Sequence, residues 1–416
     1  MQLKTILNRV QKQRFFVYGE PSLRKEGGQL VLDVPIYPRA NSRPVCSGCF
    51  KRRSTYDHLD ARRFEFVPLW GILVFFLYVM RRVNCPRCGV VVEAVPWATG
   101  KHQITTTYAW FLAGWAKRLS WTDVAVTFKT SWDTVYRSVE MAVEWGRAHM
   151  SLEGVTAIGI DEIALRKGHR YLTLVYQIDE GCRRLLWIGA ERKAKTLGLF
   201  FDWLGATRTS ALRFVASDMW KPYINVIAER ATGVVHILDR FHIMSHFSKA
   251  IDKVRASEAR KLKGMGVEVL KGSRWSLLKR PENLTASQSV KLSDLLGYNL
   301  KTVKSYLMKE EFQIFWTYRS PFYAARFLDS WCRYVMRTRI DEMKGIARML
   351  RTHRGLIVNW FKAKASISSG AVEGLNNKAK LISRRAYGFR EQRTAEIALY
   401  HGLGRLPEPE VTHRFC

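Results

Sequence analysis

Two short apolar runs, each followed directly by an aspartate, constrain the fold of this chain more than any other feature. Residues 155–160 run into Asp161, and residues 212–217 run into Asp218. Runs of this length and composition are typical of buried strands. An acid at the exit of such a strand is held rigidly beside its neighbours. A third acid, Glu373, lies in a helical segment, and we expect the three carboxylates to meet.

Clustered carboxylates repel one another unless a cation joins them. Two Mg²⁺ ions, or Mn²⁺ in their place, are the usual partners of such a group in enzymes that handle phosphates. The sequence therefore predicts a catalytic metal site formed by Asp161, Asp218 and Glu373. Glu162 should point to the opposite side of its strand from Asp161, so we leave it out of this site.

The charge balance of the chain indicates its partner. Lys and Arg number 68 against 36 Asp and Glu, which gives a net charge of +32. A chain this basic repels itself unless a polyanion shares its surface, so nucleic acid is the expected partner. A soluble basic protein without such a partner is the alternative. The hydrophobic content of 47% is that of a globular protein of several domains.

The cysteines and the most apolar segment bear on location. Residues 67–80 are too few to span a bilayer and are expected to form buried strands. Seven cysteines, an odd number, suit a reducing compartment better than a disulfide framework. We therefore expect a cytoplasmic protein without a membrane partner.

Four of the cysteines form two CxxC pairs within a β-rich segment, residues 1–100. The pairs are Cys46 with Cys49 and Cys85 with Cys88. Four thiolates can complete a tetrahedral shell around one Zn²⁺. The pattern predicts a zinc-ribbon DNA-binding domain with a hairpin or two between the pairs. Four unrelated thiols are the alternative.

Residues 101–150 have helical periodicity. A short amphipathic helix at 120–128 and a second at 131–139, capped by Thr130 or Ser131, are separated by a tight turn. This order is that of a helix-turn-helix, although any pair of helices can give a similar pattern. In a helix-turn-helix, four side chains of the second helix would face the major groove or the DNA backbone. They are Trp132, Thr134, Tyr136 and Arg137.

The segment from 151 to 242 predicts an α/β fold. Three strands come first, followed by helix, strand, helix and strand, which is the order βββαβαβ and implies a mixed sheet. The strands are expected at 155–160, 170–178, 184–190, 212–217 and 234–238, and the helices at 196–204 and 221–230. Residues 243–365 follow as an all-helical domain, and residues 366–416 as a C-terminal helix with a basic tail.

A series of motifs resembles the DDE transposases of bacterial insertion sequences, specifically the zinc-ribbon-bearing ISL-three family. The resemblance covers nearly the whole chain. It rests on the two CxxC pairs and on the motifs at residues 131–135, 159–162, 167–171, 217–223, 239–242, 271–275, 369–380 and 384–390. It implies an RNase H-like core interrupted by an all-helical insertion, with the first acid on the first strand, the second after the fourth strand and the third on a helix after the insertion. Asp161, Asp218 and Glu373 fit these places.

The resemblance also implies an activity. Such enzymes bind the terminal inverted repeats of a transposon, cut the DNA at its ends and join the freed 3′-hydroxyl to target DNA. Two divalent ions would be held by the acids, with Asp161 bridging both, Asp218 holding one and Glu373 the other. Pairing two transposon ends requires two active sites, so a homodimer is expected. A DNA-binding regulator with an inactive nuclease fold and a nuclease that never joins its products are the competing functions.

Other residues near these motifs have less certain roles. Asp239 also follows a strand and is an alternative second acid, but the order of elements favours Asp218 and leaves Asp239 and His242 a supporting or structural role. Asn377 and Lys380 lie one and two turns after Glu373 and would hold the scissile strand. Four further basic residues, Lys378, Arg384, Arg385 and Arg390, would contact phosphates. Trp275 would stack on an unpaired base, or pack within its own domain.

Overall fold

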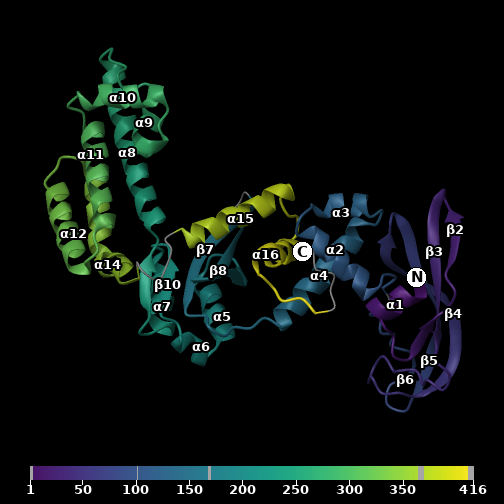
Figure 1. The fold of residues 1–416 in the computed structure, drawn as a ribbon. Coiled ribbons are helices and arrows are strands. Elements are labelled where there is room, and N and C mark those ends of the chain that lie inside the picture. The colour runs from purple at the N-terminus through teal and green to yellow at the C-terminus, as the bar shows by residue number, and fades with distance from the viewer. Residues whose placement is uncertain (1–2, 101, 167–169, 364–369, 411–416) are drawn as a thin grey trace. The chain divides into compact units, whose positions relative to one another are not determined.

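The chain forms two compact units in a computed structural model that describes residues 3–100, 102–166, 170–363 and 370–410. One unit comprises Met1–Ser151 and Arg393–Cys416, and the other comprises Leu152–Gln392 (Figure 1). Residues 167–169 of one quoted motif, and the first residue of the motif at 369–380, lie outside the described residues.

The first unit begins with helix α1 (Leu3–Val10) and a sheet of six strands. The strands are β1 (Phe16–Tyr18), β2 (Ser22–Glu26), β3 (Gln29–Pro38), β4 (Ser54–Leu69), β5 (Ile72–Cys85) and β6 (Gly89–Val92). Their order is β1-β3-β5-β4, with β2 paired to β3 and β6 paired to β5. Only β3 and β5 are parallel among these pairs.

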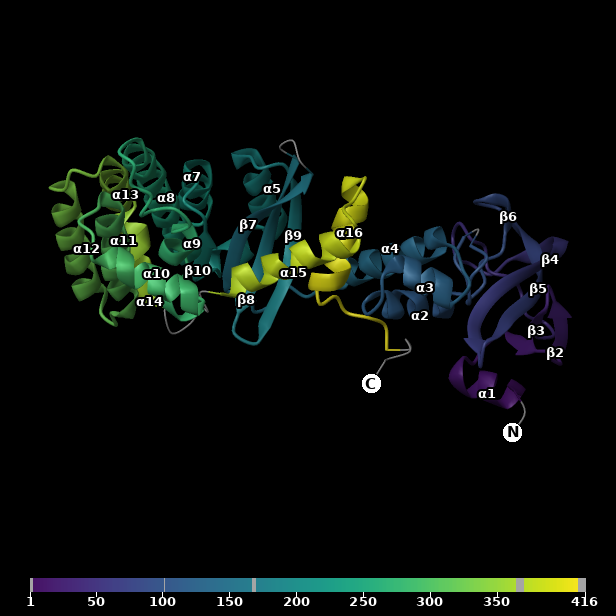
Figure 2. The same cartoon turned by 90° about the horizontal axis from the view of Figure 1, so that it is seen from above.

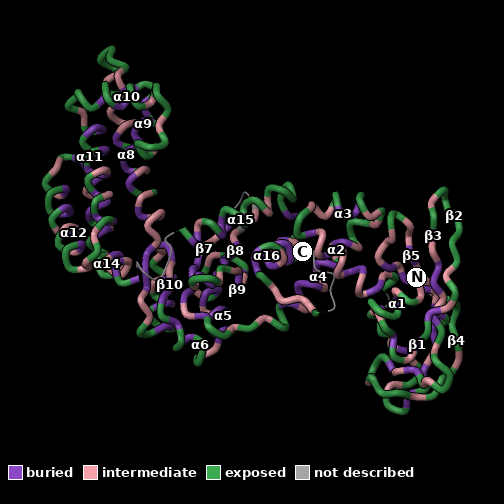
Figure 3. Tube along the Cα trace, viewed as in Figure 1, coloured by how far each residue is buried: buried purple, intermediate pink, exposed green. Residues whose placement is uncertain are grey.

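An aromatic core holds this sheet together. The Trp97 ring is fully buried and lies 4.9 Å from the Phe16 ring and 5.1 Å from the Tyr78 ring, both edge-on. Edge-to-face contacts of this kind add to the free energy gained by burying the rings. The apolar segment 67–80 belongs to the hairpin of β4 and β5, with Phe76 and Tyr78 buried, as expected of strands. The first half of β4 is largely exposed (Figure 3).

Four helices complete the first unit. They are α2 (Thr106–Ala116), α3 (Trp121–Thr127), α4 (Trp132–Ala148) and α16 (Gln392–Leu403), the last assigned to this unit from Arg393 onward. Thr105, Ser120 and Ser131 each cap the helix that follows by accepting a hydrogen bond from a backbone N–H. Arg393 pairs with Glu140 and Glu144, which attaches α16 to α4. Helix α16 therefore packs with the helices of the N-terminal unit.

The second unit is built on a five-stranded mixed sheet. Its strands are β7 (Ala157–Arg166), β8 (Arg170–Asp179), β9 (Cys182–Ala190), β10 (Phe214–Ser217) and β11 (Val235–Leu238), in the order β11-β10-β7-β8-β9. The pairs β7–β8 and β8–β9 are antiparallel, whereas β10 runs parallel to both β7 and β11. Helices α5 (Ala194–Leu204), α6 (Ala206–Ser210) and α7 (Lys221–Arg230) connect the later strands. The mixed sheet is as the sequence predicted.

Helices cover both faces of this sheet. On one face, Ile158 and Ile160 of β7 share a core with Phe200 of α5 and Tyr223 of α7. On the other face lies α15 (Ala371–Arg385), which runs across the strands (Figure 2). Side chains alternate along a strand, so the odd-numbered residues of β7 face α15 and the even-numbered ones face α5 and α7.

A helical insertion separates β11 from α15. It consists of α8 (Arg240–Gly264), α9 (Arg274–Leu278), α10 (Ala286–Leu296), α11 (Lys301–Gln313), α12 (Pro321–Met336), α13 (Asp341–Thr352) and α14 (Arg354–Ala363), with single 3₁₀ turns at Pro281–Asn283 and Ile314–Thr317. Phe247, Phe312 and Trp331 lie at the centre of its core. This all-helical insertion was predicted, and α8 begins three residues before the expected boundary at 243.

Within the described ranges, none of the helices combines the length and the apolar character that a bilayer requires.

Candidate active site and metal centres

Asp161 lies in the middle of β7, not at its end as the sequence suggested. β7 continues to Arg166 because it keeps pairing with β8, where Asp161 lies opposite Leu174. Its parallel pairing with β10 ends at Gly159. Asp161 is therefore the second residue beyond the point where these two strands separate. Its side chain is on the face covered by α15.

Asp218 follows β10 directly and is buried. One of its carboxylate oxygens accepts a hydrogen bond from the backbone N–H of Trp220 at 3.0 Å. The other forms an ion pair with the guanidinium of Arg192, which also lies 3.0 Å from the Glu162 carboxylate. The Arg192 guanidinium lies over the Trp220 ring as well, 4.7 Å from its centroid. Asp218 is thus fixed by a backbone amide and a shared cation.

Glu373 is in the first turn of α15, and a glycine lets that helix approach β7 closely. A Cβ atom on Gly159 would lie 2.3 Å from Cγ2 of Val372, so no larger residue fits there without movement. The contact brings the start of α15 over the strand that carries Asp161. The three predicted acids therefore come from β7, from the loop after β10 and from the covering helix.

Asn376 is a site residue that the sequence reasoning missed. Its side-chain amide donates a hydrogen bond to Oδ2 of Asp161, and its Oδ1 accepts one from the Tyr176 hydroxyl at 2.7 Å. Asn376 is buried, whereas the predicted Asn377 and Lys380 are exposed. Asn376 is three residues after Glu373, so it shares a helix face with that acid, and the same spacing argument that selected Asn377 could have selected it.

His242 and Asp239 border the cluster. The His242 ring lies 4.0 Å from the carboxylates of Asp161 and Asp239. The Asp161 carboxylate is the main cause that raises the pKa of His242 to about 9. Asp239 caps α8 by accepting a hydrogen bond from the backbone N–H of Phe241 at 2.8 Å. Burial is the main cause that raises the pKa of Asp239 to about 6, and Asp161 and Glu373 contribute to it.

Glu162 belongs to the same charged network, although the sequence reasoning left it out. It follows Asp161 on β7 and contacts Arg192 on the opposite face of the sheet. Burial, followed by repulsion from Asp218, raises the pKa of Glu162 to about 7. The side chains of Asp161 and Glu162 therefore point to opposite faces of β7, as expected. Asp218 lies beyond the last residue of β10, where it shares Arg192 with Glu162 and also contributes to the raised pKa of His242.

The donor set suits hard cations. Carboxylate oxygens are the ligands that Mg²⁺ prefers, and the site gathers Asp161, Glu162, Asp218, Asp239 and Glu373 against two cationic side chains, Arg192 and His242. This excess of negative charge is notable in a chain of net charge +32. The acids do not form a compact ligand group as they stand. In the described part of the chain, the four paired cysteines are the only group of three or more such residues whose ligand atoms all lie within 4.8 Å of one another.

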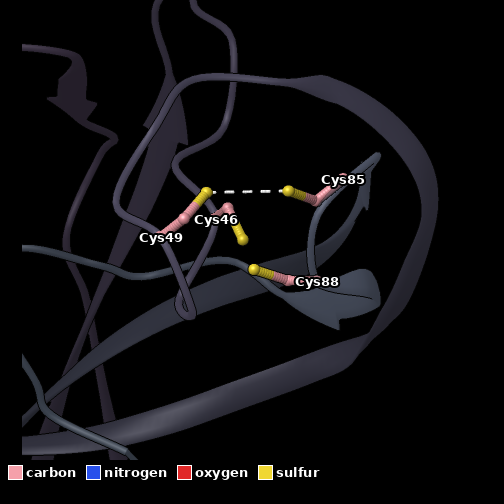
Figure 4. A group of neighbouring side chains, drawn as sticks. All are labelled: Cys46, Cys49, Cys85 and Cys88. Carbon is pink, nitrogen blue, oxygen red and sulfur yellow. Dashed lines mark hydrogen bonds between the residues drawn. The ribbon is translucent and has the colours of Figure 1, made fainter.

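These four cysteines form the second candidate metal centre (Figure 4). Cys46 and Cys49 lie between β3 and β4, and Cys85 and Cys88 flank the turn between β5 and β6. The Sγ atoms of Cys49 and Cys85 are 3.6 Å apart. The four ligand atoms all lie within 4.8 Å of one another, as a tetrahedral Zn²⁺ site requires. The strands between the two pairs form the expected hairpin.

The predicted recognition residues of α4 are partly engaged with one another. The Trp132 and Tyr136 rings are stacked with an interplanar angle of 3°, and Trp121 of α3 contacts both. Arg137 forms an ion pair with Asp133 at 2.8 Å. The hydroxyl of Thr134 lies 2.8 Å from that of the capping Ser131. Trp132 is 46% exposed, so part of its ring remains accessible.

The other predicted DNA contacts lie on the surface of the second unit. Lys378, Arg384, Arg385 and Arg390 are exposed, on α15 or just after it. Trp275, on α9, is 54% exposed, and the Arg274 guanidinium lies 5.2 Å from its ring centroid.

A mixed sheet with a helical insertion and a set of acids around its central strand is compatible with the core of a DDE-type transposase. Residues 158–398 match the family model of ISL3-type DDE transposases. The chain is 32% identical over 393 residues to the transposase of insertion sequence element IS1557 from Mycobacterium tuberculosis, covering 88% of this chain and 86% of the relative. It is 28% identical over 353 residues to the transposase of IS1001 from Bordetella parapertussis, covering 84% and 86%. The chain belongs to the ISL3-type family of insertion-sequence transposases, which confirms the resemblance found in the sequence.

Proposed function

We propose that this chain binds the terminal inverted repeats of its insertion sequence, cuts the DNA at the ends and joins the freed 3′-hydroxyl to target DNA. The observation that carries the proposal is the grouping around Asp161. The side-chain amide of Asn376 on α15 donates a hydrogen bond to the Asp161 carboxylate, and the charges of Asp161 and Glu373 both raise the pKa of Asp239. These contacts support one acidic site built from residues more than 200 positions apart in the sequence, on a five-stranded mixed sheet that is compatible with an RNase H-like core.

Asp161, Asp218 and Glu373 are the proposed ligands of two Mg²⁺ or Mn²⁺ ions. Bound divalent ions supply charge stabilisation and lower the pKa of a water or a 3′-hydroxyl at the reacting phosphate. The protein's own part is to hold the acids in place. Asn376 and the backbone N–H of Glu162 orient the Asp161 carboxylate, while Arg192 and the backbone N–H of Trp220 orient that of Asp218. Asp239, as the cap of α8, supports the site without serving as its second acid.

DNA binding is assigned to both units. A Zn²⁺-bound ribbon formed by the four paired cysteines and a helix-turn-helix of α3 and α4, with Trp132, Thr134, Tyr136 and Arg137, would recognise the repeats. Trp275, Asn377, Lys378, Lys380, Arg384, Arg385 and Arg390 would contact DNA near the cleavage site. Lys and Arg contacts to phosphates give affinity that falls with salt concentration. Because two ends must be paired before they are joined, the working form would be a homodimer bound to both, in the bacterial nucleoid.

A strand-transfer assay tests the proposal. The full chain is incubated with Mg²⁺ or Mn²⁺, labelled DNA carrying the terminal inverted repeats, and a target plasmid. The expected result is cleavage at the repeat ends followed by joined product. Asp161→Asn, Asp218→Asn and Glu373→Gln should each abolish both steps while still binding the repeat DNA, since they remove charge and keep the shape of the side chain.

The same assay separates the competing functions. Cleavage without joined product would leave a nuclease, and repeat binding without cleavage would leave a regulator. Asp239→Asn serves as the matched comparison, because Asp239 lies beside the same cluster. If Asp239→Asn abolished cleavage and Asp218→Asn did not, the assignment of the second acid would be wrong.

A further inference from the structure

Helix α15 ends in a tight turn in which one residue, Tyr387, has an unusual backbone conformation. The N–H of Gly388 donates to the carbonyl of Ser383 at 2.9 Å, and the N–H of Tyr387 donates to that of Arg384 at 3.0 Å. This pair of hydrogen bonds is the Schellman motif, whose left-handed position normally holds glycine. Tyr387 occupies that position here, with a φ of 51°.

The Tyr387 side chain is not buried, so packing does not offset the cost of this conformation. Its relative exposure is 102%, so its ring is fully exposed to solvent in the structure. A bulky residue with positive φ is strained, and glycine would form the same turn without strain. The buried aromatic of this segment is Phe389, two residues later. The fold therefore accounts for Phe389 and leaves the phenol ring of Tyr387 without a structural role.

The surroundings of Tyr387 are basic. Arg384, Arg385 and Arg390 flank it in the sequence, and all three are exposed. Exposed aromatic rings among cationic side chains are the combination used to hold unpaired nucleotides: the arginines attract the backbone and the ring stacks on a base. Trp275 offers a less accessible surface of this kind, since Arg274 lies over its ring.

We propose that Tyr387 stacks on an unpaired base of the transposon end. This contact rests on the proposed function and extends its set of DNA contacts. The ring is presented by the helix that carries Glu373, so its distance from the acidic site is set by that helix. From Glu373 to Arg385 the helix rises about 18 Å, which corresponds to roughly five base pairs of B-form DNA. The base in question therefore lies a few nucleotides from the scissile phosphate.

A protein-by-DNA cycle tests the contact. The probes are repeat-end duplexes in which each of the terminal ten or so nucleotides is replaced in turn by an abasic nucleotide. Tyr387→Gly should weaken binding to the intact end by about 5- to 150-fold, the effect of losing one base–aromatic stack. At one position, the abasic probe should lower the affinity of the wild-type protein to that of Tyr387→Gly. The affinity of the variant should be the same for this probe as for the intact end. Tyr387→Phe should behave like wild type.

Two controls separate stacking from folding. Tyr387→Gly should have a thermal midpoint equal to or above that of wild type, because it relieves the positive φ. Tyr323→Ala, a change at another exposed tyrosine of the same unit, should leave the abasic profile unaltered. A lower midpoint for Tyr387→Gly, or wild-type affinity of that variant for every probe, would overturn the proposal.

Failure of the wider function would look different. If the wild-type protein itself neither bound nor cut the repeat ends, the proposed function would fail, and the stacking contact with it. If wild type bound and cut them, and Tyr387→Gly did so equally well, only the stacking contact would fail.

Discussion

The side-chain amide of Asn376 on α15 donates a hydrogen bond to the carboxylate of Asp161 on β7. The Tyr176 hydroxyl donates to the amide oxygen of Asn376, so the amide nitrogen must face Asp161. The other Asp161 oxygen accepts the backbone N–H of Glu162 at 2.7 Å. Both oxygens of this acid are therefore oriented by the protein alone.

Asn376→Ala should reduce DNA cleavage by about 10- to 100-fold, the usual effect of removing a residue that orients a metal ligand. It should also raise the Mg²⁺ concentration needed for half-maximal cleavage. Because Tyr176 is buried and would lose its partner, the variant should lose about 1–3 kcal/mol of stability. Cleavage rates over a Mg²⁺ titration, together with thermal unfolding, measure these effects.

Tyr176→Phe is the control for this relationship, since it removes only the hydroxyl. Its effect on cleavage should be smaller, and the double variant should be no worse than Asn376→Ala, because both changes act through one amide. Additive losses would mean that the two residues act separately. An unchanged Mg²⁺ requirement in Asn376→Ala would remove the orienting role.

Arg192→Ala should destabilise the second unit. Arg192 joins the partly buried Glu162 to the buried Asp218, and its loss leaves the two carboxylates without their shared cation. Breaking a buried ion pair costs several kcal/mol, and the partial exposure of Arg192 reduces this to about 1–2 kcal/mol. Thermal unfolding of the variant measures the loss. Glu162→Gln in the same background should recover part of it, and no recovery would show that the two acids do not repel each other there.

The sequence predicted the α/β core because its strands are short apolar runs separated by clear helical periodicity. Asp161 and Asp218 were selected by a local pattern as well, an acid directly after an apolar run. The extent of β7 was not predictable in this way. Asp161 looked like a strand terminus because the apolar run ends there, but pairing with β8 carries the strand on to Arg166. A strand's length depends on its partner, which a local pattern does not contain.

The same limit explains why the sequence did not predict the roles of Asn376 and Arg192. Helical spacing placed Asn376 and Asn377 on equal terms, and only the packing of Val372 against Gly159 decides which amide faces β7. Arg192 lies in the turn after β9, a position without periodicity, so nothing in the sequence distinguished it from the many other arginines.

Zinc removal should unfold only part of the first unit. The core around the four cysteines has only three buried hydrophobic members, Cys46, Val83 and Cys85, and is separate from the aromatic core that contains Trp97. Because so few buried side chains cannot supply the folding free energy that a bound metal supplies, a chelator should unfold the ribbon. The aromatic core should remain folded. Limited proteolysis and near-ultraviolet circular dichroism distinguish the two regions.

Metal analysis supplies the control. The purified chain should contain about one Zn²⁺, as a four-cysteine site does, and Cys46→Ser should lose it. Cys182→Ser should retain it, because Cys182 lies in the other unit. Proteolytic resistance of the ribbon after complete zinc loss would disprove the structural role of the metal.

Acidification should destabilise the second unit through His236 on β11. This side chain is 6% exposed, and its Nε2 lies 2.8 Å from the Ser217 hydroxyl. Burial, with a smaller contribution from His353, lowers the pKa of His236 to about 4 from its usual 6.5. Above pH 6.5 the ring is neutral in both the folded and the unfolded chain, so it has no effect on stability there.

Between pH 6.5 and about 4, the unfolded chain binds a proton that the folded chain does not. The free energy of unfolding should therefore fall by about 1.4 kcal/mol per pH unit on account of this group, to a total of about 3 kcal/mol. Other acids titrate in the same window, so the test is a difference. His236→Gln keeps a polar partner for Ser217 but cannot be protonated. Its stability should fall less steeply on acidification than that of wild type, and parallel curves would exclude the effect.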